Sequence, residues 1–293
     1  MDSALTTVGL PIALGFIMFG LGLSLTPADF RRVAQQPLAV AVALGCQLLL
    51  LPAVCFGLVK LFDLPPLLAV GMMLLAASPG GTTANLFSHL FRGDVALNIT
   101  LTAVNSVISI VSLPIITNLA IAHFGLDDSV GMQFVKVVEV FAIVLVPVAI
   151  GMVVCAKARA FAARMDRPVR IGSAAILAVL VLGILLDERE NLAGYLADVG
   201  LVAAAFCAIS LVTGYVVPRA AGVGDEQAIA CSMEIGVHNA TLAIFVAVEV
   251  LDSTQISVPA AVYSIVMFVF AIIWGTVLSR RLRPAEPAAA QAA

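Results

Sequence analysis

The sequence predicts an all-α polytopic membrane protein with nine transmembrane helices, and three observations support that fold class. The first is composition: 62% of the 293 residues are hydrophobic and 11% are charged, whereas soluble domains are nearer half apolar and a quarter charged. The second is the length of the apolar stretches, and the third is the one-sided placement of basic residues. The composition excludes an ordinary soluble enzyme and a disordered chain. The net charge of −3 leaves no basic surplus for binding nucleic acid.

Charged and turn-forming residues cut the chain into apolar stretches, and a helix needs roughly 20 residues to cross a bilayer. We expect the nine spans at 5–26, 37–60, 67–91, 95–123, 131–156, 171–187, 195–218, 226–251 and 258–279. The first span is expected to be retained, because Asp2 is its only charge and a signal peptide would start with basic residues. No remaining stretch is long enough for a soluble domain, and 284–293 is expected to be a disordered cytoplasmic tail.

Basic residues collect in cytoplasmic loops, so their distribution predicts the orientation of the chain. With the N-terminus outside, the outer side holds only Lys60, Lys136 and Arg189 of the 15 basic residues. The inner side holds the other twelve, which are Arg31, Arg32, Arg92, Lys157, Arg159, Arg164, Arg167, Arg170, Arg219, Arg280, Arg281 and Arg283. We therefore expect the N-terminus outside, the C-terminus in the cytoplasm, and the protein in a bacterial inner membrane.

The third span contains the segment SPGGTTANLFSHLF (78–91), which interrupts the helix within the membrane. Pro79, Gly80 and Gly81 free backbone groups that must be buried in protein or line a wet cavity. The half-helix that follows starts with Thr82, and its free amides carry partial positive charge that attracts anions. This pattern predicts an anion site within the membrane.

The eighth span contains the segment CSMEIGVHNATLAIF (231–245), with Glu234 well inside it. A carboxylate at membrane depth needs a counter-charge, a proton or a cation. Gly236, His238 and Asn239 follow, which favours an unwound segment whose carbonyls join the carboxylate around a cation. Oxygen ligands without thiolates indicate an alkali or alkaline-earth ion.

The two interrupted spans enter the membrane from opposite sides, an arrangement typical of secondary transporters built from inverted repeats. We expect the first repeat at 1–124 and the second at 125–283, with the binding site where the two breaks meet. The alternative is that the Pro-Gly-Gly segment is only a kink and that Glu234 is an acid with satisfied hydrogen bonds. A single break would not separate these interpretations, whereas two breaks with polar clusters favour the transporter.

The fourth span carries a polar stripe beside the broken third span. Its members are spaced so that they share one helix face, and they are Asn98, Thr102, Asn105, Ser106 and Ser109. Such a stripe is either ordinary hydrogen bonding between helices or a set of ligands. Gln47, in the middle of the second span, has the same two interpretations.

The motifs GGTTAN (80–85), GDVALNITLT (93–102) and EIGVHN (234–239) resemble those of the bile acid:sodium symporter family. The resemblance covers nearly the whole chain. The segment GFIMFGLGLSLTPADF (15–30) looks like the second helix of ten-helix members, so the chain resembles the nine-helix version. The family implies a core of spans two to four and seven to nine, a panel of the other spans, and sodium-coupled alternating access for an organic anion. We expect the chain to function in the lipid bilayer as a monomer.

The resemblance also implies two sodium sites that share one carboxylate. The first site would use Asn85, Asn98, Thr102 and Glu234, with Ala84 where the family has a serine. The second site would use Gln47, Glu234 and the carbonyls of Ile235 and Val237, with His238 where the family has a glutamine ligand.

His238 is a departure with chemical consequences. A neutral imidazole offers nitrogen, which is a poor ligand for hard Na⁺, and it titrates near neutral pH. The second site is therefore expected to be weakened, supported by fewer ligands, or proton-sensitive. The alternative is that His238 only forms a hydrogen bond where the two broken helices cross and ligates no ion.

Substrate contact would fall to Thr82, Thr83 and Asn239, where the two half-helices face each other. Relatives that bind bile acids can carry a polar His-Asn pair in the last span, whereas this chain has Met267 and Phe268 there. A small carboxylate, such as a 2-keto or hydroxy acid, is therefore expected rather than bile acid itself.

Other functions remain as alternatives. A proton-influenced or partly sodium-coupled exporter of organic acids is one of them. An intramembrane hydrolase is another, but the chain lacks GxSG and HExxH, and GVGD (222–225) falls in a predicted inner loop without a second aspartate at membrane depth. A scaffold or channel would have no reason to place a carboxylate between two inverted breaks.

Overall fold

The computed structural model describes residues 10–26, 28, 31, 34–126, 134–187 and 192–281, and all regular elements among them are helices. In chain order they are α1 (Leu10–Ser24), α3 (Pro37–Gly45), η2 (Cys46–Leu50), α4 (Leu51–Leu61), α5 (Pro66–Ala77), α6 (Thr82–Leu90), α7 (Val95–His123), α8 (Phe134–Lys157), α9 (Arg159–Asp187), α10 (Leu192–Ala220), α11 (Asp225–Gly236), α12 (Ala240–Phe245), η4 (Val246–Val250) and α13 (Thr254–Arg281). The prediction of an all-α protein is confirmed for these residues.

Four helices in the described part of the chain are long and apolar enough to cross a bilayer, namely Pro37–Leu61, Val95–His123, Ala197–Ala220 and Thr254–Arg281. Shorter apolar helices lie at Leu14–Ser24, Pro66–Ala77, Leu145–Lys157 and Ala240–Val250. The first of the long helices combines α3, η2 and α4. These lengths and compositions support the membrane class that the sequence predicts.

The helices in the third and eighth predicted spans are both interrupted. Residues 78–81 separate α5 from α6, and residues 237–239 separate α11 from α12. All residues of Leu68–Ala77 in α5 and of Ala228–Gly236 in α11 are buried. The half-helices α5 and α11, which lead into the breaks, therefore lie in the interior of the protein, where backbone groups freed by the breaks find protein partners instead of lipid.

The start of α9 differs from the predicted sixth span. The span was expected to begin at residue 171 after a basic inner loop, but α9 is helical from Arg159 onward. The residues between these two positions are rich in Ala and Arg, which are strong helix formers. A run of positive charge marks the inner side of a membrane protein without ending a helix, so the helix begins before the predicted span.

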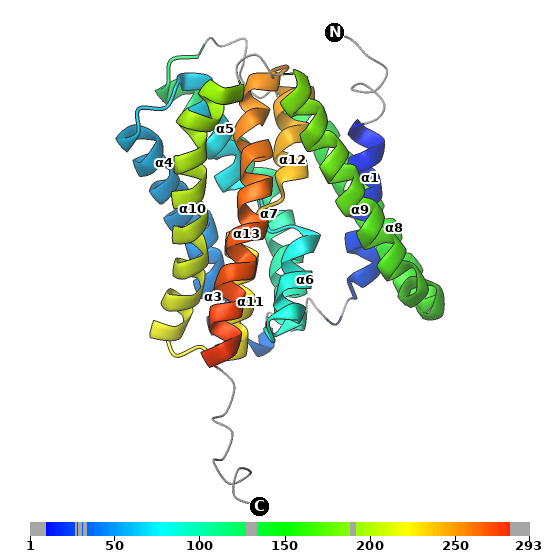
Figure 1. Ribbon diagram of the computed structural model, residues 1–293. Coiled ribbons are helices and arrows are strands. Elements are labelled where there is room, and N and C mark those ends of the chain that lie inside the picture. Colours follow the sequence, from blue (N-terminus) through cyan, green and yellow to red (C-terminus); the bar gives the residue numbers. More distant parts are fainter. Residues whose placement is uncertain are drawn as a thin grey trace, which may run out of the picture.

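Helices α1, α8 and α9 pack on one another and form one side of the molecule, drawn in blue and green at the right of Figure 1. The backbones of α1 and α8 approach closely, because a Cβ added at Gly22 would collide with Val148 and one at Gly151 would collide with α1. Small residues commonly permit such approaches between membrane helices. In the rest of the molecule α10 packs on α11 and α13, and α13 packs on α5.

Asp94 joins three segments at the start of α7. Its Oδ1 caps the helix by accepting from the amide of Leu97 at 2.9 Å. Its Oδ2 accepts from Nε2 of Gln36 at 3.2 Å, and its own N–H donates to the carbonyl of Glu226 at 2.9 Å. The cap therefore fixes the entrance of α7 against the start of α11.

Replacing Asp94 by Ala is expected to lower the free energy of unfolding by about 1–2 kcal/mol, since loss of a helix N-cap typically costs about 1 kcal/mol. Asp94→Asn is the control, because an amide oxygen can still cap the amide of Leu97. Thermal unfolding in detergent measures the difference. An unfolding midpoint for Asp94→Ala equal to that of the wild type would contradict the role of this cap.

Candidate functional site

The two breaks cross and bond to each other through their backbones. Gly80 pairs with His238 in an isolated antiparallel bridge. Two backbone hydrogen bonds form this bridge: Gly81 N–H to the Val237 carbonyl at 3.1 Å, and Asn239 N–H to the Pro79 carbonyl at 2.8 Å. Each break thus supplies partners for backbone groups that the other has freed from its helix, which explains how two unwound segments can be stable away from water.

Glu234 lies beside the crossing and is 1% exposed. Its Oε1 accepts from the N–H of Gly80 at 3.2 Å, and its Oε2 accepts from Oγ1 of Thr102 at 2.5 Å. Asn105, a buried residue of α7, also lies close to this carboxyl group. Among the described residues no basic side chain forms an ion pair with Glu234. The ion pair that those residues do form joins Arg219 to Asp225, which lies at the start of α11. The carboxylate is held by hydrogen bonds, and none of the described basic side chains compensates its charge.

Three amide oxygens around the crossing are buried without a hydrogen-bond partner in the structure. They belong to Gln47, Asn85 and Asn98. The amide nitrogens of two of them are used: Nε2 of Gln47 donates to the carbonyl of Ser78 at 2.9 Å, and Nδ2 of Asn98 donates to the carbonyl of Ala230 at 2.8 Å. A buried acceptor without a partner costs about 1–3 kcal/mol. A bound cation would supply that partner, and neutral oxygens with one carboxylate suit a hard monovalent cation.

Gln47 lies in a π-helical turn, η2, between α3 and α4. Such turns within α-helices occur frequently at functional sites. Gln47 is also 2% exposed, so its amide oxygen is held inside the protein near the carbonyl of Ser78, the residue at which the first break begins.

The residues predicted to contact substrate present hydrogen-bond donors. Thr82 and Thr83 are half-buried in the first turn of α6. The first amides of a helix have no intrahelical acceptor, and no side chain caps those of α6. The amide of Ala84 donates to the carbonyl of Gly81 at 3.0 Å. Asn239 uses its Oδ1 to cap α12 by accepting from the amide of Leu242 at 3.0 Å. Its Nδ2 group remains as a donor, and donors of this kind suit an anionic ligand.

Two aromatic residues that no sequence motif indicated also hold the crossing. The ring of Phe206 stacks on the imidazole of His238 with 5.5 Å between centroids. Tyr263 meets the edge of the same imidazole at 5.5 Å, and its hydroxyl donates to the carbonyl of Gly236 at 2.9 Å. Both lie in apolar spans among similar residues, so only the contacts distinguish them. Asn105 was visible in the sequence as a member of the polar stripe.

A model of the sodium bile acid symporter family matches residues 11–195, which is more than half of the chain. The chain belongs to the sodium bile acid symporter family.

Relatives of this symporter-family chain are named as transporters. It is 28% identical, over 92% of its length, to a probable sodium/metabolite cotransporter of chloroplasts from Arabidopsis thaliana. It is 28% identical over 87% of its length to an uncharacterized sodium-dependent transporter of Bacillus subtilis, and 27% identical over 53% to a sodium-dependent organic anion transporter of Bos taurus. The family and the names of these relatives describe transport and not enzymatic catalysis. Together with the apolar helices, they identify the chain as an integral membrane protein.

The chain spans only part of these symporter-family relatives. It covers 66% of the Arabidopsis protein, 78% of the Bacillus protein and 41% of the bovine protein.

In this member of the symporter family, His238 takes part in the crossing through its ring. Its Nδ1 lies 3.2 Å from the carbonyl oxygen of Ser78. Because a carbonyl only accepts, the geometry places the proton of a neutral imidazole on Nδ1 and leaves a lone pair on Nε2. That Nε2 is buried without a hydrogen-bond partner. The side chain is a structural part of the crossing that also presents one unpaired nitrogen.

Asp225, the acidic residue of the GVGD motif, has ordinary partners. It is the first residue of α11, it pairs with Nε of Arg219 at 2.9 Å, and it accepts from the hydroxyl of Tyr215 at 2.9 Å. Its side chain is 39% exposed. This arrangement is a surface ion pair at a helix start, where an acidic residue complements the helix dipole, and it gives no support to the hydrolase alternative.

Proposed function

We propose that this protein is a sodium-coupled secondary transporter of a small organic anion that works by alternating access. The observation that carries the proposal is the hydrogen bond from the N–H of Gly80 in one break to the carboxylate of Glu234 beside the other. This hydrogen bond joins the two interrupted helices. Its acceptor, Glu234, is the only deeply buried acid among the described residues near the crossing. A cation bound by that carboxylate would therefore act on both half-helix pairs at once, which is what coupling of ion binding to a conformational change requires.

We assign the sodium ligands in two overlapping sets, and the unpaired oxygens of Gln47, Asn85 and Asn98 support them. The first set is Asn85, Asn98, Thr102 and Glu234. The second set is Gln47, Glu234 and the carbonyls of Ile235 and Val237, with His238 beside them. The second set is the weaker because His238 contributes nitrogen where the first set contributes only oxygen.

The proposed architecture has nine spans in two inverted repeats, with the N-terminus outside, the C-terminus in the cytoplasm of a bacterium, and a monomer as the working unit. The packing of α1, α8 and α9 on one another supports a division into a panel and a core. Rocking of that panel against the core would expose the crossing to one side of the membrane and then to the other.

The substrate is proposed to be a small carboxylate bound by Thr82, Thr83 and Asn239. Hydrogen-bond donors in the first turn of α6 support an anion. The last span supports a small ligand, because Met267 is buried and Phe268 packs against Phe87 with 5.6 Å between ring centroids. These side chains offer no polar group to a large steroid.

The test is a thermal-shift screen of organic acids in NaCl and in KCl, followed by uptake into proteoliposomes. A ligand that binds the native state raises the unfolding midpoint by mass action. The substrate is expected to stabilise the protein in sodium and not in potassium, and to accumulate only with an inward sodium gradient. Equal stabilisation and equal uptake in both salts would contradict sodium coupling.

Replacing His238 by Gln is expected to strengthen sodium binding by about threefold to tenfold, because an amide oxygen replaces a nitrogen at the second set of ligands. The sodium concentration for half-maximal uptake and the Hill coefficient measure the change. His238→Ala is the control, since it removes the nitrogen without adding an oxygen. An unchanged Hill coefficient and affinity in His238→Gln would contradict this role of His238 and favour the alternative of a proton-influenced or partly sodium-coupled exporter of organic acids.

A further inference from the structure

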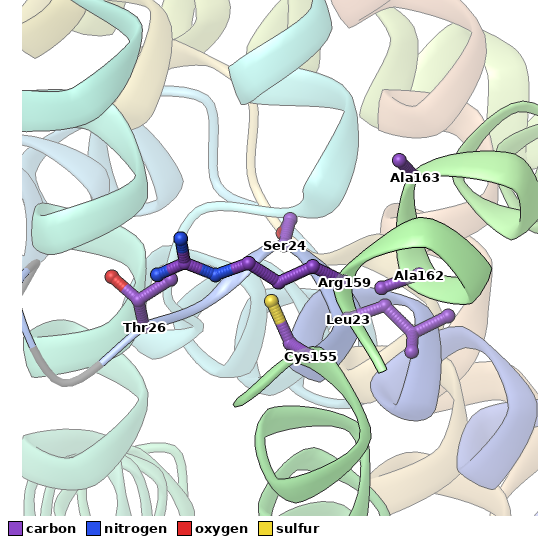
Figure 2. Close-up of a pocket in the computed structure, with 7 residues that line it drawn as sticks. All are labelled: Leu23, Ser24, Thr26, Cys155, Arg159, Ala162 and Ala163. Atoms are coloured by element: carbon purple, nitrogen blue, oxygen red, sulfur yellow. The ribbon is translucent and has the colours of Figure 1, made fainter. Parts of the chain in front are cut away.

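A cavity of about 440 Å³, open to the outside of the protein where Arg159 and Ala163 are exposed, lies between the end of α1 and the junction of α8 with α9 (Figure 2). Its polar lining is Ser24, Thr26, Cys155 and Arg159, and the rest of the lining is leucine and alanine. None of these residues belongs to the crossing, so the cavity is separate from the proposed transport site. Its volume is within the range of pockets that hold small ligands.

Arg159 gives the cavity its charge. Its side chain extends across the cavity and its guanidinium points toward Thr26 (Figure 2). Among the described residues no carboxylate lines the cavity, and none of the described acidic residues forms an ion pair with Arg159. A guanidinium presents several N–H donors in a planar fork that matches the oxygens of phosphate and carboxylate. The cavity therefore suits an oxyanion.

The surroundings of the cavity indicate where that oxyanion comes from. Lys157 and Arg164 are exposed on the same junction, and Phe161 between them is 50% exposed. Basic residues interleaved with an exposed aromatic ring are typical of segments that lie at a lipid headgroup layer. We propose that the cavity binds the phosphate of an anionic phospholipid headgroup, in the cytoplasmic leaflet if the proposed orientation holds. A lipid bound there would anchor the α1, α8 and α9 group to that leaflet.

Cys155 provides a direct probe of occupancy. It lines the cavity and is half-buried, whereas Cys46, Cys55, Cys207 and Cys231 are buried. N-ethylmaleimide, which is uncharged, should therefore react at Cys155 before it reacts at the others. The experiment measures this rate by mass spectrometry for the full chain in nanodiscs of phosphatidylcholine, with and without phosphatidylglycerol.

Phosphatidylglycerol is expected to slow the modification of Cys155 about tenfold if the site is about nine-tenths occupied. Arg159→Gln should lose this protection. Arg164→Gln should keep it, because Arg164 lies on the same helix outside the cavity lining. Both variants experience the same anionic surface, so the comparison separates a site at Arg159 from a general effect of surface charge on the thiol.

Two results would overturn the proposal. Equal protection in Arg159→Gln and the wild type would show that no headgroup is held by this guanidinium. Equal protection by inorganic phosphate or acetate in phosphatidylcholine discs would show that a free small anion occupies the cavity instead of a lipid. Neither readout depends on transport, so the outcome is independent of the proposed function.

Discussion

Replacing Glu234 by Gln is expected to abolish sodium-dependent uptake. The amide preserves the size of the side chain, but it removes the only deeply buried charge described at the crossing. It also places an NH₂ group where one carboxylate oxygen now accepts a hydrogen bond from Gly80 or Thr102. A charged hydrogen-bonding partner contributes about 1.5–3 kcal/mol, which corresponds to about a tenfold to hundredfold loss of sodium affinity. Uptake rates and sodium-induced thermal shifts measure this loss.

Glu249→Gln is the matched control for this variant. Glu249 is a half-buried carboxylate in η4 of the same predicted span, away from the crossing. Its substitution is expected to leave sodium dependence close to wild type. Retention of a normal sodium response by Glu234→Gln would remove the carboxylate from the proposed ion sites.

Replacing Gly80 by Ala is expected to have an effect nearly as large. A Cβ at this position would collide with the carboxylate of Glu234. The carboxylate must then move away and lose its hydrogen bond from the backbone N–H of residue 80. Overpacking of this kind costs about 1–3 kcal/mol, and the cation site would lose its geometry. We expect loss of the sodium-induced thermal shift and of uptake, with the protein still inserted and folded.

Gly81→Ala is the control one residue away. A Cβ there would meet Oγ1 of Thr83 at 3.5 Å and the backbone of Asn239 at 3.6 Å, which are ordinary contacts. The backbone of Gly81, with φ −95° and ψ 171°, is also accessible to alanine. Sodium-dependent uptake should therefore persist in Gly81→Ala. Equal losses in both variants would mean that the break tolerates no side chain at all and that Glu234 is not the cause.

Local signals in the sequence were sufficient to locate both helix breaks. A proline followed by two glycines strongly disfavours a continuous helix, and a carboxylate in an apolar span is rare enough to stand out. Gln47, Asn98 and Thr102 were visible for the same reason, since a polar group in a membrane span needs a partner. Local signals failed at the start of α9, because basic residues mark the inner side of a membrane but remain good helix formers.

Composition and pattern therefore determined the membrane class, the positions of the breaks and the acid between them. Only the tertiary structure decided which groups meet. Gly80 and Glu234 are far apart in the chain, and nothing local shows that the N–H of one reaches the carboxylate of the other. The same holds for the aromatic rings of Phe206 and Tyr263 around His238, and for the cavity at Arg159. The sequence pattern shows which side chains need a partner inside a membrane. Packing between helices that are distant in the chain determines which partner each side chain meets, and no local periodicity contains that information.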